Sequence, residues 1–321
     1  MNVERKGFNM KKKILITGVA GFIGSKLATE LLNKGHHVLG VDILKYDSTS
    51  INHLYRFKNF IFLKEDITKP VILKKILKNV EFIFPLAGLV GAPLCEKFKK
   101  EAVNVNLNAI KLLVKLVNKN QKIIYPTSNS GYGIGQKNAF CNEETPLNPI
   151  SLYGRTKSMA EKEIAKHKNY ISFRLATVFG YSYRMRSDLL VNNFVKTAID
   201  TKKLDIFEPH FRRNYIHIDD IVKAFTFSLD NFLKLKNNVF NLGLSSANIT
   251  KYELAKKVKK HLKKVKIKIV KNKKDPDQRD YFVSNKKIEK KGFKASVSLD
   301  EGILELQKVF TNSDVKINNN Y

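Results

Sequence analysis

Three glycines near the start of the chain constrain its fold more than any other feature. Gly18, Gly21 and Gly24 follow residues 13–17, which read KILIT, a β-branched run typical of a buried strand. Residues 25–33 come next and carry apolar side chains at helical spacing. The first glycine permits a tight turn, and the third lets a helix pack closely against the strand. The pattern therefore predicts a strand, a glycine turn and a helix in succession.

An acidic residue ends the next apolar run. Residues 37–41 predict a second strand, and Asp42 follows it directly. Gly21 would let the backbone approach a pyrophosphate, which the N–H groups and the positive end of the helix dipole would bind. Asp42 is placed to accept hydrogen bonds from the ribose hydroxyls of an adenosine, and its charge would repel a 2′-phosphate. The sequence therefore predicts a site for NAD rather than NADP.

Strand and helix patterns continue to alternate through the first half of the chain. Strands are predicted at 60–64, 81–84 and 122–125, and a long helix over 96–117. Alternation of this kind predicts an α/β fold with a parallel, doubly wound sheet.

A serine, a tyrosine and a lysine then stand at spacings that suit oxidation of an alcohol. Tyr153 and Lys157 are four residues apart and would share one face of a helix, while Ser128 follows the fifth predicted strand. A lysine ammonium stabilises a nearby phenolate, so Tyr153 can take the proton of a substrate hydroxyl while hydride leaves to NAD⁺. Ser128 can bond the same substrate oxygen, and Lys157 can also bind the nicotinamide ribose.

These motifs resemble those of a known superfamily. The GxxGxxG spacing with Ser128, Tyr153 and Lys157 resembles the short-chain dehydrogenase/reductases, and TGxxGFIG resembles their extended branch, the NAD-dependent epimerase/dehydratase family. The resemblance covers roughly residues 11–310. It implies an enzyme, a Rossmann-like NAD-binding domain and a smaller C-terminal lobe that binds a nucleotide sugar.

Domain boundaries follow from the same resemblance. We expect the NAD-binding domain at 11–178, with 205–232 returning to it, and the substrate lobe at 179–204 and 233–315. Residues 1–10 are expected to form a disordered tail.

The resemblance also implies which residues contact the cofactor. At the loop after the fourth strand, Pro85 and Gly88 depart from the family's usual His-Leu-Ala-Ala, and we expect backbone contacts there. The expected NAD contacts are Gly18, Gly21, Phe22, Ile23, Gly24, Asp42, Asp66, Ile67, Leu86, Ala87, Asn106, Tyr153 and Lys157.

A second set is expected to bind the sugar nucleotide. Arg213 and Arg279 should converge on its diphosphate, because a guanidinium binds such a group bidentately. Thr177 stands where the family usually has an asparagine, so the sugar contact there differs. The expected substrate contacts are Asn129, Ser130, Thr177, Arg186, Asn192, Arg213 and Arg279.

Several reactions are compatible with these residues. Dehydration is disfavoured, because it needs an acid and a base directly after Ser128, where Asn129 and Ser130 stand. The strings FPLAGLVGAPLC, SNSGYGIG and NLGLSSANIT resemble bacterial capsule-pathway dehydrogenases that oxidise C4 of GDP-D-glycero-α-D-manno-heptose. A 4-epimerase such as UDP-glucose 4-epimerase would use the same three residues. A non-catalytic NAD-binding regulatory protein is disfavoured by the intact Ser128, Tyr153 and Lys157.

The amino-acid composition limits the classes of molecule that we expect this chain to bind. The formal net charge is +30, but lysines are spread along the chain without a DNA-binding motif, so we expect no nucleic acid. No apolar run is long enough for a membrane helix, and two cysteines exclude a disulfide scaffold. No metal-binding histidine spacing occurs; His217, Cys95 and Cys141 are expected to be structural. We expect a cytoplasmic homodimer that pairs through helices near 97–118 and 152–167.

Overall fold

The computed structural model describes residues 11–46, 48–135, 139–271, 278–312, 315–317 and 319–320. The expected disordered tail at 1–10 lies outside the described residues.

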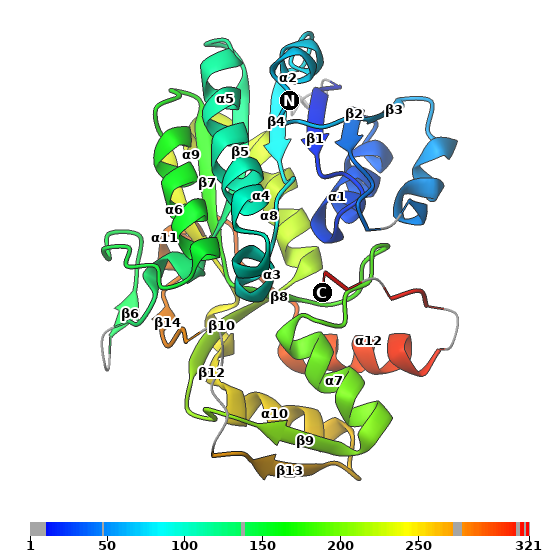
Figure 1. Ribbon diagram of the computed structural model, residues 1–321, viewed down its shortest axis with the longest axis vertical. Coiled ribbons are helices and arrows are strands. Elements are labelled where there is room, and N and C mark those ends of the chain that lie inside the picture. Colours follow the sequence, from blue (N-terminus) through cyan, green and yellow to red (C-terminus); the bar gives the residue numbers. More distant parts are fainter. Residues whose placement is uncertain are drawn as a thin grey trace, which may run out of the picture.

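A seven-stranded sheet forms the centre of the larger part of the molecule (Figure 1). All of its strand pairs are parallel, and the order is β11-β7-β5-β4-β1-β2-β3, which confirms the predicted doubly wound α/β fold. Its strands are β1 (Lys13–Thr17), β2 (His37–Asp42), β3 (Phe60–Lys64), β4 (Phe82–Pro85), β5 (Lys122–Ser128), β7 (Tyr170–Leu175) and β11 (Asn238–Leu242).

Helices cover both faces of this sheet, because its central strands are apolar on both sides. In β1, Ile14 and Ile16 point into one hydrophobic core and Leu15 into the other, as the two-residue period of a strand requires. The first core includes side chains of α1 (Phe22–Asn33) and α8 (Ile218–Asp230). The second includes side chains of α2 (Pro70–Ile76), α5 (Ala109–Leu116) and α6 (Leu152–Ile164). Helices α5 and α6 pack together, and their expected role in a homodimer stays a prediction.

The long helix expected over 96–117 is broken. It is replaced by α3 (Ala92–Lys97), α4 (Lys99–Val103), a π-helical segment η2 (Asn104–Asn108) and then α5. Phe98 has φ −120° and ψ 57°, which is not helical, so the chain turns between α3 and α4. A π-helical segment inside an α-helix often accompanies a functional site. Here it carries Asn106, whose role is described below.

Several of the remaining strands and helices form the smaller part below the large sheet in Figure 1. Strand β10 (Arg212–His217) pairs in parallel with β8 (Thr177–Phe179) and antiparallel with β12 (Asn248–Thr250). Two small parallel pairs join β9 (Lys203–Ile206) to β13 (Lys266–Ile269), and β6 (Phe140–Cys141) to β14 (Phe282–Val283). The other helical segments are α7 (Leu190–Thr201), α9 (Phe232–Leu235), α10 (Lys251–His261), α11 (Lys286–Lys290), α12 (Leu299–Thr311), η1 (Thr49–Arg56), η3 (Asn129–Tyr132) and η4 (Ser245–Ala247).

One expected boundary needs correction. We assigned all of 233–315 to the smaller lobe, but β11 lies within that range and forms an edge of the large sheet next to β7. Its residues Phe240 and Leu242 are fully buried in the first core, which explains why the chain returns to the sheet. The other domain boundaries remain a proposal.

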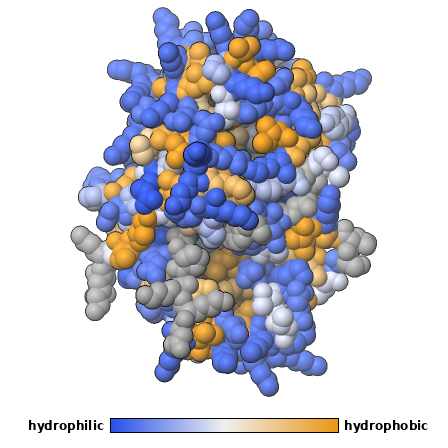
Figure 2. All heavy atoms as spheres, in the orientation of Figure 1, coloured by the Kyte–Doolittle hydropathy of each residue, from blue (hydrophilic) through white to orange (hydrophobic). Residues whose placement is uncertain are grey.

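The face of the molecule that is seen in Figure 2 is mainly hydrophilic. Figure 2 shows hydrophilic side chains interspersed with smaller hydrophobic areas on the viewed face. Within the described ranges, no helix is both long enough and apolar enough to span a bilayer.

Candidate active site

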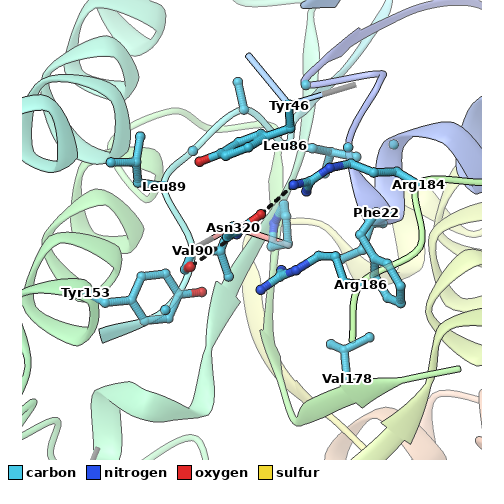
Figure 3. A pocket seen from close by; sticks show the side chains of 18 of the residues that line it. Phe22, Tyr46, Leu86, Leu89, Val90, Tyr153, Val178, Arg184, Arg186 and Asn320 are labelled. Carbon is cyan, nitrogen blue, oxygen red and sulfur yellow. Dashed lines mark hydrogen bonds between the residues drawn. The ribbon is translucent and has the colours of Figure 1, made fainter. Parts of the chain in front are cut away.

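A cavity of about 690 Å³ lies at the carboxyl ends of the parallel strands (Figure 3). This edge is where open α/β sheets bind their ligands. The glycine turn after β1, Asp42 after β2 and Ser128 at the end of β5 all line it, together with Tyr153 and Lys157. The folded chain therefore brings the predicted cofactor turn and the three predicted catalytic residues to one cavity.

The glycine turn has no room for side chains. Gly18 has φ +73°, and a Cβ there would lie 2.6 Å from the Ala87 nitrogen. At Gly24 a Cβ would lie 2.2 Å from the Gly18 carbonyl oxygen. Helix α1 begins after Gly21 without a side-chain cap and without an acidic residue in its first turn. Its first turn lines the cavity through Phe22, Ile23 and Gly24 and has no capping side chain or carboxylate, which fits the diphosphate of a dinucleotide.

Asp42 is held in place by the backbone on either side. Its carboxylate accepts hydrogen bonds from the Ala20 N–H at 3.0 Å and the Leu44 N–H at 2.8 Å. Burial raises the pKa of Asp42, and these two hydrogen bonds act in the opposite direction. Further predicted cofactor contacts also line the cavity: Phe22, Ile23, Asp66, Ile67, Leu86 and Ala87.

Asn106, an expected NAD contact, is not among the residues that line the cavity. Its side-chain oxygen accepts from the Leu89 N–H at 2.8 Å, and its amide donates to the Leu89 carbonyl at 2.9 Å. Both ends of the amide are therefore used to hold the loop after β4. A Cβ at Gly88 would lie 2.8 Å from the Asn106 oxygen, so this close approach requires the glycine that departs from the family pattern.

Ser128 is the last residue of β5, and its hydroxyl oxygen accepts two hydrogen bonds from Ser130. The Ser130 hydroxyl donates to the Ser128 oxygen at 2.8 Å, and the Ser130 backbone N–H donates to it at 3.1 Å. Ser130 and Asn129 do not line the cavity, although both were expected to bind substrate. Asn129 is buried, and among the described residues its side-chain amide has no hydrogen-bond partner.

Tyr153 lies in the first turn of α6, which Ser151 caps by accepting from the Gly154 N–H at 3.1 Å. Burial, and then the nearby Cys95, raises the pKa of Tyr153 to about 12. Arg279, the Ser128 hydroxyl and Arg186 act in the opposite direction. A phenol in this setting keeps its proton until further positive charge arrives.

Lys157 follows one turn later on the same face of α6. Burial lowers its pKa to about 7, although Cys95 and Glu161 act to raise it. Its ammonium nitrogen lies 4.3 Å from the centre of the Tyr125 ring. We expected Lys157 to supply the charge that stabilises the Tyr153 phenolate. The largest charge effects that lower the pKa of Tyr153 come from Arg279 and Arg186, and the contribution of Lys157 stays a prediction.

Two predicted arginines meet at one aromatic side chain. Arg279 donates to the Tyr281 hydroxyl at 3.3 Å, and the Arg213 guanidinium lies 6.0 Å from the Tyr281 ring centre. Both arginines line the cavity, as do Thr177 and Arg186. Arg186 is also paired with Asp188. Four of the seven predicted substrate contacts therefore line the cavity, and the three arginines among them contact other side chains.

Asn192 is placed differently from the expectation. Its side-chain oxygen accepts from the Gly180 N–H at 3.1 Å, and its amide donates to the carbonyls of Gly180 at 3.1 Å and Arg186 at 2.8 Å. It is fully buried and lies outside the cavity lining. Asn192 therefore braces the loop that carries Arg186, and its contact with a substrate stays a prediction.

Several cavity residues that can bind a ligand through polar groups were not among the predicted contacts. Tyr46, Arg184, Asn319 and Asn320 all line the cavity. Arginine is scarce beside lysine in this chain, which was a signal for Arg184. No sequence pattern points to the two asparagines, which come from the end of the chain.

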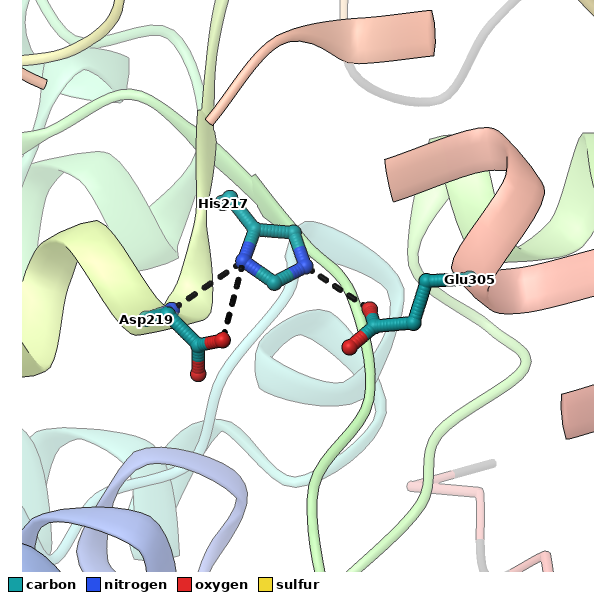
Figure 4. Close-up of side chains that lie close together, drawn as sticks. All are labelled: His217, Asp219 and Glu305. Carbon is teal, nitrogen blue, oxygen red and sulfur yellow. Dashed lines mark hydrogen bonds and ion pairs between the residues drawn. The ribbon is translucent and has the colours of Figure 1, made fainter. Parts of the chain in front are cut away.

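His217 lies apart from the cavity and joins two helices (Figure 4). Its Nδ1 accepts from the Asp219 N–H at 3.3 Å, and its Nε2 lies 2.8 Å from the Glu305 carboxylate. Asp219 is also paired with Lys26, and Glu305 accepts from the Tyr181 N–H at 3.0 Å. Each group thus has a partner within the protein, which fits a structural role. Cys95 and Cys141 are free and buried.

The comparisons with known proteins agree with the geometry of the site. Residues 14–243 match the model of the NAD dependent epimerase/dehydratase family. The chain is 32% identical to the uncharacterised UDP-glucose epimerase YtcB of Bacillus subtilis, over 67% of this chain and 71% of that protein. It is 30% identical to UDP-glucuronate 4-epimerase 4 of Arabidopsis thaliana, over 78% of this chain, and spans 66% of that enzyme, just under two thirds.

Solved structures show the same arrangement. The UDP-glucuronic acid 4-epimerase of Bacillus cereus, in complex with UDP-glucuronic acid and NAD, superposes with a TM-score of 0.82. It is 25% identical, and the match covers 94% of this chain and 99% of that one. The dTDP-glucose 4,6-dehydratase of Bacillus anthracis, solved with NAD, shares the fold with a TM-score of 0.81 at 23% identity, over 94% and 97% of the chains.

Proposed function

This chain belongs to the NAD-dependent epimerase/dehydratase family, and we propose that it oxidises the C4 hydroxyl of a nucleotide sugar and passes the hydride to NAD. The observation that carries this proposal is the common cavity of Ser128, Tyr153 and Lys157 with the glycine turn. If the chain were instead a non-catalytic NAD-binding protein, the remote alternative, Ser128, Tyr153 and Lys157 would have no chemical role.

Tyr153, Ser128 and Lys157 have different roles in the proposed oxidation. Tyr153 takes the hydroxyl proton, and Ser128 donates a hydrogen bond to the same oxygen as it becomes a carbonyl. Bound NAD supplies the oxidised nicotinamide that accepts the hydride, so one C–H bond and one O–H bond are broken and a C=O bond forms. The amine of Lys157 is free to donate to ribose hydroxyls. Hydrogen bonds from it would favour its charged form and, through it, the phenolate of Tyr153.

The substrate side of the cavity supports an anionic nucleotide sugar. Arg213 and Arg279 lie around Tyr281 and can bind a diphosphate bidentately. Asn129 and Ser130 follow Ser128 and are neither acid nor base near neutral pH. The proposed reaction therefore stops at the ketone or reverses, and does not continue to elimination of water.

We propose GDP-D-glycero-α-D-manno-heptose as the substrate and a 4-keto sugar as the product, in the synthesis of a capsule or surface polysaccharide. Support comes from the strings FPLAGLVGAPLC and SNSGYGIG, which resemble enzymes of that kind. A second candidate is 4-epimerisation of a UDP-sugar, because relatives at 30–32% identity bear the names of UDP-sugar epimerases. Both candidates share the first step, the oxidation at C4.

Separate incubations with three nucleotide sugars distinguish the candidates. The purified chain is mixed with GDP-D-glycero-α-D-manno-heptose, UDP-glucose or UDP-galactose, with and without added NAD, and followed by absorbance of reduced cofactor and by NMR of the sugar. A 4-keto product and reduced cofactor from the GDP-heptose alone support the dehydrogenase. Interconversion of the two UDP-hexoses without net reduction would establish the epimerase and exclude the GDP-heptose proposal.

A further inference from the structure

The end of the chain returns to the cavity and is fixed there by contacts with one loop. Ile317 forms a β-bridge with Met185, and the Asn319 side-chain oxygen accepts from the Ser187 N–H at 2.8 Å and hydroxyl at 3.0 Å. Asn320 is buried between that loop and the loop after β4. Its oxygen accepts from the Arg184 guanidinium, and its amide donates to the Val90 carbonyl at 3.3 Å (Figure 3). We call residues 315–317 and 319–320 the C-terminal tail.

The C-terminal tail contacts Arg184, whose surroundings favour the binding of an anion. Arg184 is buried, and its guanidinium lies over the Tyr46 ring, 4.3 Å from the ring centre. Burial and the neighbouring cation of Arg186 lower the pKa of Arg184 to about 10. In the tail, Asn320 offers this guanidinium a neutral amide oxygen and no charge. The diphosphate of a dinucleotide, with one negative charge on each phosphate, would lower the electrostatic cost of burying this guanidinium.

The loop that carries Arg184 is tied to the glycine turn. The Ser182 hydroxyl donates to the Phe22 carbonyl at 2.5 Å and lies 3.2 Å from the Ser25 hydroxyl. Phe22 and Ser25 belong to the first turn of α1, where the N–H groups face the predicted diphosphate site. Arg184 stands two residues beyond Ser182, so its cation is held on the same side of the cavity as the helix N-terminus.

The tail forms a wall of the cavity and does not fill it. With Asn319 and Asn320 in place, a cavity of about 690 Å³ remains, within the range of 300–1,000 Å³ that is common for ligand pockets. A ligand can therefore be bound while the contacts of Asn320 with Arg184 and Val90 persist.

We propose that the C-terminal tail holds Arg184 against the diphosphate of bound NAD, and that the tail thereby retains the cofactor. Helix α1 supplies N–H groups, Arg184 supplies a guanidinium from the loop that is tied to that helix, and Asn320 fixes the guanidinium. The proposal relies on the proposed function only for the identity of the cofactor and is independent of the sugar.

The test measures release of the reduced cofactor from the full-length chain without any sugar nucleotide. The protein is loaded with NADH and mixed with excess NAD, and the fall in NADH fluorescence gives the release rate. Asn320→Ala should release NADH about tenfold faster, because a fixed charge-assisted contact is lost. Asn312→Ala is the matched control: Asn312 is exposed and does not line the cavity, so its release rate should stay within twofold.

A second variant distinguishes retention of the cofactor through the charge of Arg184 from a purely structural role of Asn320. Asn320→Asp would bind Arg184 more strongly, so a purely structural role of Asn320 predicts unchanged or slower release of NADH. The proposal predicts faster release, because the carboxylate would neutralise the guanidinium and repel the diphosphate. Release within twofold of the intact chain for both Asn320 variants would overturn the proposal, and so would slower release. Because no sugar is present, loss of the proposed C4 oxidation would leave this result unaffected.

Discussion

The Ser130 hydroxyl donates a hydrogen bond to the hydroxyl oxygen of Ser128 at 2.8 Å, and the Ser130 backbone N–H donates to the same oxygen at 3.1 Å. A serine hydroxyl has two acceptor positions and one donor. With both acceptor positions filled, the proton of Ser128 is directed toward another acceptor. Since Ser128 lines the cavity, that acceptor is the substrate oxygen or the Tyr153 phenol. Ser130 therefore acts as a positioning residue for Ser128.

Replacement of Ser130 by alanine should slow turnover and leave substrate binding nearly unchanged. Ser128 would lose one fixed donor and could rotate away from the substrate oxygen. We expect kcat to fall about fivefold to tenfold with KM within twofold, since the contact matters most in the transition state. Steady-state kinetics on the nucleotide sugar that is turned over measures both. Ser130→Thr keeps the hydroxyl and should restore most of kcat. An equal loss in both variants would contradict the positioning role.

The carboxylate of Asp42 should set the preference between the two dinucleotides. Asp42→Asn removes a negative charge that accepts from ribose hydroxyls and would repel a 2′-phosphate. We expect the Kd of NAD to rise about tenfold and the Kd of NADP to fall. The chain has no tryptophan, so the fluorescence of the reduced cofactors reports binding without interference. If the ratio of the two dissociation constants is unchanged, Asp42 does not select the cofactor.

The sequence predicted those parts of the site that depend on local pattern. The glycine turn, Asp42 after β2, Ser128 at the end of β5 and the helix of Tyr153 follow from strand and helix periodicity with short spacings. Parallel strands then bring their ends to one edge, so these residues had to meet.

The tertiary contacts of several polar residues could not be predicted from the sequence. An asparagine amide can bind a ligand or brace a backbone, and the sequence does not distinguish the two. Asn106 and Asn192 both brace loops. The contact between Arg184 and Asn320 joins positions 136 residues apart, and no periodicity encodes it. The break at Phe98 likewise depends on how the loop after β4 packs.

Replacement of Lys157 by methionine should stabilise the protein in a pH-dependent way. Burial lowers the pKa of Lys157 from 10.5 in the unfolded chain to about 7 in the folded one. The unfolded state then binds more protons between these values, so the penalty for burying the amine is full below about pH 7 and vanishes by about pH 10.5. Lys157→Met should gain up to about 4 kcal/mol at pH 6, and this gain should shrink as the pH rises toward 10.

Urea unfolding of both proteins between pH 6 and pH 10 checks this prediction. Lys162→Met changes an exposed lysine on the same helix, and its effect should stay within about 0.5 kcal/mol at every pH. A gain for Lys157→Met that does not vary with pH would show that packing alone causes it.

The ion pair of Glu161 and Arg174 should stabilise helix α6 far more than its exposed neighbour does. Arg174 donates to both Glu161 oxygens, at 2.7–3.2 Å, and both side chains are 7% exposed. Glu161→Gln leaves a buried guanidinium without its counter-charge, so we expect a loss of about 3 kcal/mol. Glu163→Gln, which removes the exposed pair with Lys166, should cost less than about 1 kcal/mol. Equal shifts in the denaturation midpoint would contradict this account.

Transfer of deuterium from C4 tests the central claim most directly. The chain is incubated with GDP-D-glycero-α-D-manno-heptose or UDP-glucose that carries deuterium at C4, and the cofactor is then released and weighed by mass spectrometry. The account predicts that one of these sugars yields reduced cofactor heavier by one mass unit, and that Tyr153→Phe yields none. A 4-keto product formed without deuterium in the cofactor, or undiminished transfer by Tyr153→Phe, would contradict it.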